Sequence, residues 1–401
     1  MRWLLLGAAL LAAAVRAQPF AGPAANGSLL LLPASGQQVL VDGVAFQALV
    51  DRLDAQREQI NQLNQQLSMH LTGLKCTTTT DTTSIGGLGG TAMWLGGVAA
   101  PNGKIYGIPH NANAVLIMDP ASNTVDITSI VVSNGGYYWA GGVLAGNGKI
   151  YGMPSNGNAV LVIDPTTNAV DYTTITVPTG DGKWFFGVLA RNGKIYGPPQ
   201  YATSVIILDP ATNATDTTSM TGFDGSLNKW LGGTLAGNGK IYCLPAFMST
   251  VLIIDPDTNT TDTTTIAGLV GNDKWWGGVL APNGKIYGIP RDATSVLIID
   301  PATNTADITT MTGLVSDVDG KWAGGVLAPS GKIYGVPLSA NSVLVIDPAT
   351  NTTDTTSLTV PAGDYKWRGS VLADNGQIYG VPASADSALV IHSMCTVTGG
   401  L

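Results

Sequence analysis

Glutamate and histidine, which commonly transfer protons or bind metal ions, are scarce in this chain of 401 residues. Its single glutamate, Glu58, lies upstream of the repeats described below, and only two histidines, His110 and His392, fall within them. These two histidines occupy different positions of their repeats, and no lysine and tyrosine stand at a spacing that suggests a catalytic pair. We therefore predict no catalytic residue, no cofactor and no enzymatic activity.

An aspartate recurs in sequences such as DPATN, and it could in principle bind a metal ion. Calcium takes about 6–8 oxygen ligands, and one carboxylate per turn falls well short of that number. Aspartate followed by proline is instead typical of the first two positions of a β-turn. The recurring aspartates therefore predict turns and no metal site; they are Asp119, Asp164, Asp209, Asp255, Asp300 and Asp347.

Tryptophans also recur, at Trp94, Trp139, Trp184, Trp230, Trp275, Trp322 and Trp367. A ring of exposed indoles could stack on sugars, whereas a repeated aromatic more often packs between neighbouring units. Lysine precedes five of these tryptophans, with acidic residues often nearby: Lys183, Lys229, Lys274, Lys321 and Lys366. We expect surface ion pairs there, which contribute little to stability.

The copies differ most at the two residues that follow a repeated proline. These pairs begin at His110, Ser155, Gln200, Ala246, Arg291, Leu338 and Ala383. Loops on a rigid scaffold are the usual place of recognition, although neutral variation in exposed loops is the alternative. The candidate ligand-binding residues are His110, Asn111, Gln200, Tyr201, Phe247, Met248, Arg291, Asp292, Trp184, Trp230, Trp275 and Trp322.

A long repeat must position these residues. The sequence NGKIYGIP and its relatives place a tyrosine at Tyr106, Tyr151, Tyr196, Tyr242, Tyr287, Tyr334 and Tyr379. Within one copy, GGVLA, KIYGIP, SVLIID and TADITTM read as short strands separated by turns such as PNG and DPATN. A period of this length is typical of a propeller or a solenoid. We predict an all-β fold over residues 76–401, a closed seven-bladed β-propeller with four-stranded antiparallel blades.

The two ends of the repeats predict how the ring closes. TTTTDTTSI at 77–85 matches a fourth strand with no blade before it, and the last copy lacks a good fourth strand. An open solenoid would need capping repeats instead. Closure would bring Cys76 and Cys395 together, which predicts a disulfide in an oxidising compartment; two unrelated thiols are the alternative. Cys243 replaces a repeated glycine, and we expect it to be buried.

Three segments precede the repeats. Residues 1–17 combine Arg2 with a short apolar run, which predicts a cleaved secretory signal and no membrane span. Residues 18–38 are expected to form an extended linker. Residues 39–75 carry apolar residues in heptads, at Val39, Phe46, Leu53, Ile60, Leu67 and Leu74. We predict a coiled-coil stalk that joins copies of the chain through residues 39–74, with a lone helix packed on the body as the alternative.

The net charge and the glycosylation sequons bear on the ligand class and the cellular location of the protein. The net charge of −8 gives nucleic-acid binding no electrostatic support. Four N-x-S/T sequons begin at Asn26, Asn213, Asn259 and Asn351 and are candidate glycosylation sites. Together with the signal sequence, they predict a secreted, extracellular or cell-surface-associated protein.

The stretch GKIYGIPRDATSVLIIDPATNTADITT resembles the repeats of YVTN-type propellers of cell-surface proteins. It is also similar to the streptogramin-lyase-type propeller, in which G-x-I/L-W is followed by I-D-P-x-T. The likeness covers about 77–401 at the level of the repeat pattern and implies a seven-bladed propeller. The lyase chemistry rests on histidine, glutamate and a divalent metal, and these repeats contain no glutamate, so the resemblance implies the architecture and not the activity.

These observations predict an oligomeric binding or adhesion protein of the cell surface or extracellular matrix. A shared stalk would multiply weak contacts, and a surface rich in tryptophan and poor in charge suits a glycan or glycoprotein ligand. Two alternatives stay open. One is a structural subunit of an extracellular assembly, and the other is a propeller enzyme of the lyase or hydrolase type.

Overall fold

The computed structural model describes the backbone of residues 74–132, 136–315 and 318–397, together with four two-residue strands nearer the N-terminus. Side chains are described from residue 77 to residue 392, with the same two internal gaps. The chain divides into two compact units, Thr77–Met394 and a second unit made of Met1–Cys76 and Cys395–Leu401. The predicted signal segment and most of the predicted stalk lie outside the described residues.

Two small hairpins are described in the second unit. β1 (Gly22–Pro23) pairs with β2 (Leu29–Leu30), and β3 (Leu40–Val41) pairs with β4 (Val44–Ala45), both antiparallel. β3 and β4 fall at the start of the segment predicted as a coiled coil, and the structure has strands there at residues 40–41 and 44–45. Here the β-branched valines pair as strands, which the heptad spacing alone did not indicate.

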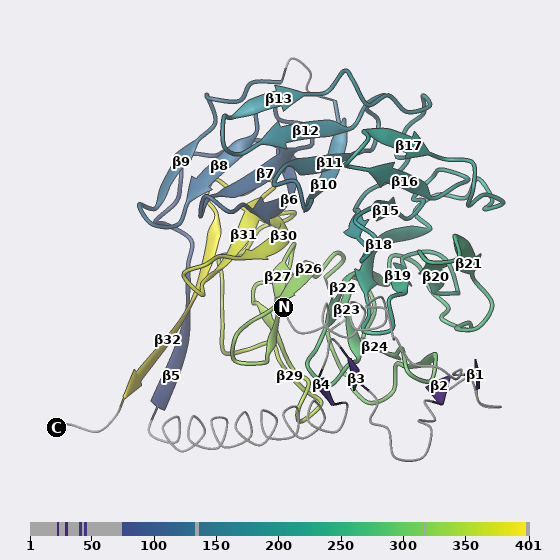
Figure 1. The fold of residues 1–401 in the computed structure, drawn as a ribbon. Coiled ribbons are helices and arrows are strands. Elements are labelled where there is room, and N and C mark those ends of the chain that lie inside the picture. The colour runs from purple at the N-terminus through teal and green to yellow at the C-terminus, as the bar shows by residue number, and fades with distance from the viewer. Residues whose placement is uncertain are drawn as a thin grey trace. The chain divides into compact units, whose positions relative to one another are not determined.

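The unit Thr77–Met394 is a β-propeller of seven four-stranded antiparallel sheets, or blades. Figure 1 shows the first strands around a central space and the fourth strands at the rim. Blades one to three are β6 (Trp94–Ala99), β7 (Ile105–Pro109), β8 (Leu116–Asp119) and β9 (Thr124–Asp126); β10 (Trp139–Leu144), β11 (Ile150–Pro154), β12 (Leu161–Asp164) and β13 (Ala169–Asp171); and β14 (Val188–Leu189), β15 (Ile195–Gly197), β16 (Ile206–Asp209) and β17 (Ala214–Asp216).

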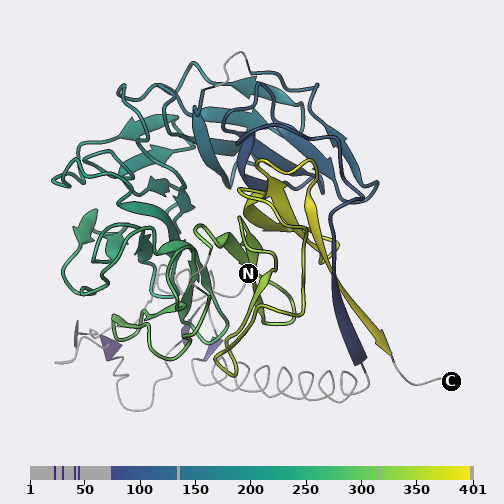
Figure 2. The ribbon, with the colours of Figure 1, turned by 180° about the vertical axis from the view of Figure 1, so that it is seen from behind.

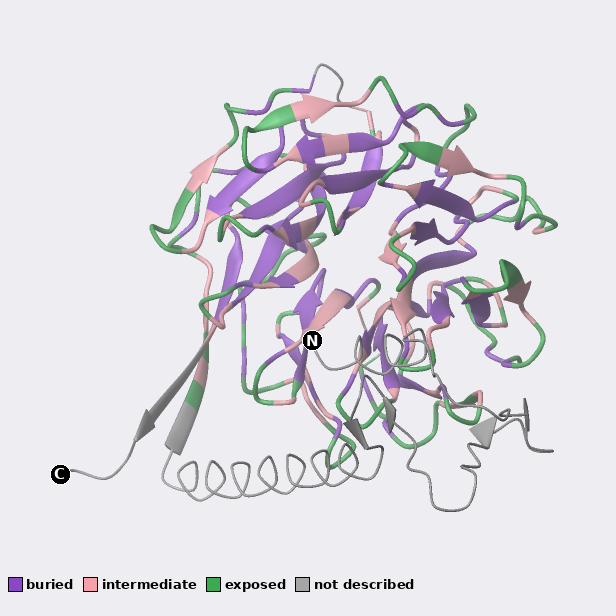
Figure 3. Cartoon of the chain, viewed as in Figure 1, coloured by how far each residue is buried: buried purple, intermediate pink, exposed green. Residues whose placement is uncertain are grey.

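Blades four to six repeat the arrangement. Their strands are β18 (Trp230–Leu235), β19 (Ile241–Pro245), β20 (Leu252–Asp255) and β21 (Thr260–Asp262); β22 (Trp275–Leu280), β23 (Ile286–Pro290), β24 (Leu297–Asp300) and β25 (Thr305–Asp307); and β26 (Trp322–Leu327), β27 (Ile333–Pro337), β28 (Leu344–Asp347) and β29 (Thr352–Asp354). Burial follows this order, since Figure 3 shows the inner strands mostly buried and the outer strands partly exposed.

Blade seven draws its strands from both ends of the repeats. Its order is β30 (Trp367–Leu372), β31 (Ile378–Pro382), β32 (Leu389–Val397) and then β5 (Leu74–Asp81). Just beyond β5, the amide of Ala388 donates to the carbonyl of Ile85. Figure 2 shows β5 and β32 side by side from the opposite direction. In this sheet, the strand next to β32 is β5, from the N-terminal side of the repeats.

A repeated backbone link joins each blade to the next. The residue before each first-strand tryptophan donates its amide to the carbonyl that follows the proline of the preceding blade, as Lys183 does to Ser155 at 3.0 Å. Seven such bonds occur, and Met93 to Ala383, at 2.9 Å, joins blade one to blade seven. Because every blade makes the link, the loops near the axis form one continuous hydrogen-bonded network.

The NGKIYGIP motif forms hydrogen bonds between neighbouring blades. The side-chain amide of Asn102 donates to the hydroxyl of Tyr106 at 2.9 Å and to the carbonyl of Pro165, in the next blade, also at 2.9 Å. The Tyr106 hydroxyl donates to the same carbonyl at 3.3 Å. Because Pro165 belongs to a DPxTN turn, the two repeated motifs serve each other across the blade boundary.

The aspartates of the DPxTN sequences form the predicted turns. The carboxylate of Asp119, for example, accepts the amide of Ala121 at 2.9 Å. A second aspartate, at the end of each fourth strand, closes another turn; Asp307 accepts the amides and hydroxyls of Thr309 and Thr310. This turn recurs seven times as D-x-T-T or D-x-T-S, and it gives every blade the same outer edge.

Candidate ligand-binding face and central pocket

The two ends of the blades differ in sequence. We call one end the variable face; it consists of the connections from strand two to three and from strand four to the next blade. Its described residues lie within 82–93, 127–138, 172–187, 217–229, 263–274, 308–321 and 355–366, and within 110–115, 155–160, 198–205, 246–251, 291–296, 338–343 and 383–388. The other end carries the near-identical PNG and DPxTN turns.

The variable pairs after the prolines divide into an inner and an outer residue. The first residue is buried in most blades, as in His110 and Gln200, each 5% exposed. The second residue supports the next blade in two cases, since Asp292 accepts the amide of Gly320 and Asn156 accepts that of Gly182. Asn111 donates to the carbonyl of Thr91, at 3.2 Å, in the connection that leads into its own blade. Variation there therefore serves loop support as well as any ligand.

Three of the predicted ligand residues lie outward. Phe247 is exposed, while Tyr201 and Met248 are half-buried on the same face. Arg291 is half-buried and pairs with Asp273, a residue of the adjacent connection. The structure thus places these predicted residues on one face of the propeller, but it does not gather them into one site.

The four tryptophans predicted to contact ligand lie in the core. Trp184, Trp230, Trp275 and Trp322 are 1–2% exposed. Each indole N–H donates to a backbone carbonyl twenty residues later, as Trp184 does to Ser204 at 2.8 Å. Trp139 shares a hydrophobic cluster with Tyr106 of the preceding blade, which illustrates their place between blades. The structure favours packing over sugar stacking, because these buried rings present no face to a ligand.

The lysines before the tryptophans are also buried, so the prediction that they form surface ion pairs is wrong. The ammonium of Lys274, 3% exposed, donates to the carbonyls of Ala246, Met248 and Gly271 at 2.7, 3.0 and 2.6 Å. Burial lowers the pKa of Lys274 to about 8, which leaves the group mainly charged at neutral pH. The backbone carbonyls satisfy the charge that an acidic partner was expected to balance, and they tie two loops together.

Exposed apolar side chains gather on the variable face. All nine large hydrophobic residues that are exposed among the described ones lie within its connections: Ile127, Val131, Tyr137, Leu227, Phe247, Val270, Ile308, Val315 and Tyr365. Ile127 and Ile308 lie at the outer edge of this face, directly after fourth strands. Exposed apolar residues in the loops at one end of a rigid scaffold are candidates for contact with a ligand.

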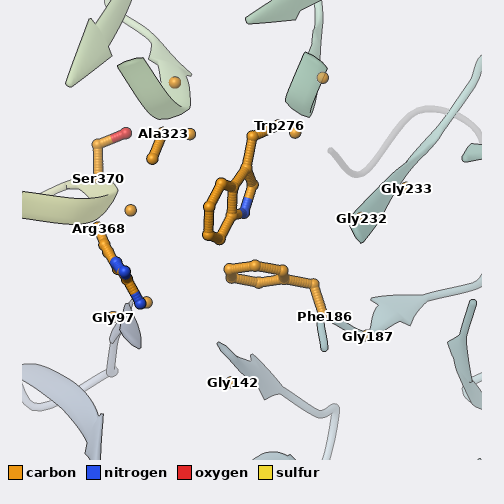
Figure 4. A pocket seen from close by; sticks show the side chains of 16 residues that line it. Gly97, Gly142, Phe186, Gly187, Gly232, Gly233, Trp276, Ala323, Arg368 and Ser370 are labelled. Atoms are coloured by element: carbon orange, nitrogen blue, oxygen red, sulfur yellow. The ribbon is translucent and has the colours of Figure 1, made fainter. Parts of the chain in front are cut away.

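A pocket with a cavity volume of about 200 Å³ lies where the first strands meet at the axis (Figure 4). Glycines line most of it, with Phe186, Trp276, Ala323, Arg368 and Ser370 between them. A larger residue would clash at several of these positions; for example, a Cβ on Gly369 would come within 2.9 Å of the Gly96 Cα. The glycines thus leave the centre open while the backbones of neighbouring blades touch.

A β-bulge in the first strand orients the residues that line the pocket. In six blades the pairing of strands one and two shifts just after the tryptophan, as between Trp275 and Gly278. In five of them the second residue after the tryptophan is a glycine with positive φ, such as Gly277 at 82°. Phe186 replaces that glycine in blade three, where regular pairing begins only at Val188. Bulges commonly redirect a side chain next to a functional site.

We call the residue after each first-strand tryptophan the axial residue. The seven are Leu95, Ala140, Phe185, Leu231, Trp276, Ala323 and Arg368. The first six belong to one hydrophobic cluster at the axis. Arg368 is the only charged member, so blade seven breaks an otherwise apolar ring.

Arg368 has aromatic neighbours and no acidic partner among the described residues. Its guanidinium lies 5.7 Å from the Trp276 ring centroid and 5.2 Å from that of Tyr365. Its Nε is buried without a hydrogen bond, as is the hydroxyl of Ser370 two residues later. Burial and the nearby Arg291 lower the pKa of Arg368 from its ordinary value. The axis of this acidic protein therefore holds a partly buried positive charge.

His110 and Arg291 connect the variable pairs to this pocket. Arg291 lies 5.2 Å from the Trp276 ring centroid, and the His110 ring packs edge-on against Phe185 at 5.8 Å. Burial, opposed by a hydrogen bond to the Trp139 carbonyl and reinforced by Arg368, lowers the pKa of His110 to about 4. His110 is therefore neutral at physiological pH and contributes no charge there.

Sequence reasoning missed Arg368, Ser370, Phe186 and Trp276. It compared the residues after the prolines and treated the first strands as uniform. The signal was present, since the axial residue varies from alanine to arginine beside an invariant tryptophan. Serine and phenylalanine also replace repeated glycines two or three residues after the tryptophan, in blades seven and three.

The remaining predicted sites are placed as follows. Asn213, Asn259 and Asn351 are exposed turn residues with positive φ, and Asn351 also accepts the Tyr287 hydroxyl at 3.2 Å. Asn26 and the side chains of Cys76 and Cys395 lie outside the described residues. Cys243 is buried, as predicted, and its thiol is free.

Two further properties concern metals and membranes. Within residues 77–132, 136–315 and 318–392, no three histidine, cysteine, aspartate or glutamate side chains come together as a metal site would require. Among the described residues, no helix has the length and apolar character needed to cross a lipid bilayer.

The comparisons with known proteins concern the fold alone. No protein-family model and no curated protein sequence matches the chain. A streptogramin B lyase is similar in structure, with a TM-score of 0.61 and 12% identity over 80% of this chain and 98% of that one. So is the extracellular domain of a protein assigned as a hybrid two-component system of Bacteroides thetaiotaomicron, with a TM-score of 0.57 and 12% identity over 81% of this chain and 44% of that one.

An auxiliary nutrient binding protein from Bacteroides ovatus is a third similar structure. Its TM-score is 0.50 and its identity 12%, over 80% of this chain and 78% of that one. Sequence identities this low establish a common architecture. The architecture is the seven-bladed propeller that the repeats predicted.

Proposed function

We propose that this chain is an extracellular binding protein that recognises glycans or glycoproteins through its variable face. The observation that carries the proposal is the placement of the exposed large apolar residues among the described ones, all nine of which lie on one face, among them Tyr137, Phe247 and Tyr365. Exposed aromatic rings are suitable platforms for sugars, because they offer an apolar face beside polar groups. At the opposite end of the blades, the PNG and DPxTN turns form hydrogen bonds with one another between neighbouring blades.

The similar structures support this class of function. An extracellular domain and a nutrient binding protein share the architecture, and a lyase shares it as well. We favour binding over catalysis because the pocket at the axis holds an arginine, a serine and aromatic residues, but no histidine or carboxylate lines it. A general acid or base would have to come from outside that lining.

The test is binding of the full-length chain to a glycan array, with a matched pair of variants. Phe247→Ala removes an exposed side chain from the variable face, and Lys149→Ala removes one from a strand-one-to-two turn at the other end of the blades. We expect Phe247→Ala to weaken binding by about 10-fold or more, as truncation of a contact residue does, and Lys149→Ala to leave it unchanged. Absence of binding to any arrayed glycan would refute the proposal, and an equal effect of the two variants would refute the assignment of the face.

The same proposal includes secretion, self-association and closure of the ring. We propose that the N-terminal segment directs secretion, that residues 39–74 join copies of the chain, and that pairing of β5 with β32 closes the propeller. The heptads, the sequons and the bond between Met93 and Ala383 support these steps. The mass of the secreted protein in solution tests self-association, since a monomer would exclude avidity through the stalk.

A further inference from the structure

The pocket at the axis carries an uncompensated positive charge. Arg368 contributes a guanidinium, and the charged and ionisable groups that influence it are Arg291, Tyr365 and Tyr137. Arg291 is already paired with Asp273, so that carboxylate is engaged. Partial burial of a charge without an acidic partner is costly, and a bound anion would offset that cost.

The aromatic neighbours of Arg368 orient it without neutralising it. Trp276 and Tyr365 lie within cation–π distance, at 5.7 and 5.2 Å from the guanidinium carbon to the ring centroids. Such contacts hold the plane of the guanidinium while leaving its N–H groups able to donate. A planar fork held in this way matches the two oxygens of a carboxylate.

Ser370 and Phe186 add a donor and an apolar wall. Figure 4 shows both side chains around the same pocket as Arg368 and Trp276. The Ser370 hydroxyl is buried without a hydrogen-bond partner, and its counterparts in the other blades are glycines. A buried hydroxyl of this kind is destabilising unless something binds it.

The size of the cavity limits the ligand. About 200 Å³ is less than the roughly 300–1,000 Å³ of pockets that take drug-sized molecules. A single ring fits such a space, whereas a chain of several rings does not. The lining combines an aromatic wall, a hydroxyl and backbone groups of glycines. Such a lining suits a small ring that is apolar on its faces and polar at its edges.

We propose that the central pocket binds the carboxylate-bearing ring of an acidic sugar, with Arg368 pairing with the carboxylate and Ser370 donating a further hydrogen bond. This rests on the proposed function, and it names the sugar class for the pocket beside the variable face. The exposed aromatic residues of that face would then contact the rest of a larger glycan.

Isothermal titration of the full-length protein with glucuronate and with glucose tests the inference, because the two share a ring and differ in the carboxylate. We expect glucuronate to bind at least about 10-fold more tightly. Arg368→Leu should weaken glucuronate binding by about 10-fold or more and leave glucose binding unchanged. Leucine is the axial residue in blades one and four, so this variant is compatible with the fold.

Arg191→Gln is the matched control, since Arg191 lies in a strand-one-to-two turn at the other end of the blades. It should bind glucuronate as the unaltered protein does. Ser370→Gly, which restores the glycine of the other blades, should weaken glucuronate binding several-fold and keep the protein folded. Inorganic sulfate serves as a further probe, because sulfate binding equal to that of glucuronate would indicate a general anion site and overturn the assignment to a sugar.

Equal affinity for glucuronate and glucose, or full glucuronate binding by Arg368→Leu, would overturn the inference. If Arg368→Leu still binds the glycan array and Phe247→Ala does not, the inference about the central pocket is wrong and the proposed function of the variable face stands. If both variants still bind the array, the inference and the assignment of the variable face are both wrong.

Discussion

The hydroxyl of Tyr242 in blade four donates to the side-chain oxygen of Asn304 in blade five at 2.6 Å, and it also contacts the Pro301 carbonyl at 3.4 Å. The same hydroxyl accepts from Asn238, at 3.0 Å, within its own blade. One buried phenol thus joins Asn238 of its own blade to two residues of the next blade. The most repeated motif of the chain therefore serves assembly of the propeller.

Tyr242→Phe should destabilise the propeller, because it removes this hydroxyl and keeps the ring. Loss of the hydrogen bonds, with partners left unpaired, should lower the free energy of unfolding by about 1–3 kcal/mol. Denaturant unfolding followed by tryptophan fluorescence measures the change.

Tyr334→Phe is the control for that change. In blade six, Ser330 replaces the motif asparagine, and no hydrogen bond of the Tyr334 hydroxyl is found within the described residues. The control should cost less than Tyr242→Phe. Equal losses would mean that the ring, and not the hydroxyl, holds the blades together.

Lys274→Met tests the buried lysines. The ammonium satisfies three carbonyls, so its removal should destabilise the propeller by about 2–4 kcal/mol, since buried acceptors are then left unpaired. Lys285→Met is the comparison, because Lys285 pairs with Asp300 at 3.6 Å on the surface and should contribute about 0–1 kcal/mol. Thermal unfolding of both variants distinguishes a buried structural lysine from a surface ion pair. Similar losses of stability in the two variants would contradict the structural role of Lys274.

The repeat predicted the blades because each repeated residue has a local role that is visible in sequence. Asn-Gly turns, DPxTN turns and alternating apolar residues indicate strands without reference to the rest of the chain. The place of Cys243 followed from a substituted glycine. The burial of Lys274 could not be predicted in this way. Its partners are backbone carbonyls, which every residue has, so no residue type in the sequence indicates them.

The central pocket was harder to predict than the blades. Arg368 becomes notable only when the first strands are known to meet at the axis, and the bulge that turns it inward depends on the positive φ of Gly369. At the N-terminus, heptad spacing extended the predicted helix over residues 40–45, where the structure has the hairpin of β3 and β4. Spacing alone does not separate a short apolar hairpin from the first heptad of a helix.

Stability should fall in acid below about pH 4. Hydroxyl and amide donors from Thr309 and Thr310 lower the pKa of Asp307 to about 2, and the equivalent turns do the same for Asp171, Asp216 and Asp354. A carboxyl whose pKa is lower in the folded state stabilises the fold above its unfolded pKa of about 3.8 and loses that contribution as the pH falls toward 2. Because these carboxylates are only partly buried, each contribution is small, and their number makes the effect measurable.

Thermal unfolding midpoints at pH 7, 4 and 2.5 check this prediction. We expect little change between pH 7 and 4 and a clear decrease between pH 4 and 2.5. Asp307→Asn should shrink that decrease. A midpoint that stays constant down to pH 2.5 would contradict the role of these turns.

The proposed Cys76–Cys395 disulfide predicts the thiol count of the secreted protein. After unfolding without reductant, one thiol per chain should react with a thiol reagent, namely that of Cys243, which is free and buried in the folded protein. Three reactive thiols would exclude the bond. If it forms, the double change Cys76→Ser and Cys395→Ser should lower the free energy of unfolding by up to about 4 kcal/mol, because the bond closes a loop that spans the whole propeller. Cys243→Ser alone should leave the β5–β32 junction intact and provides the control for removal of a thiol.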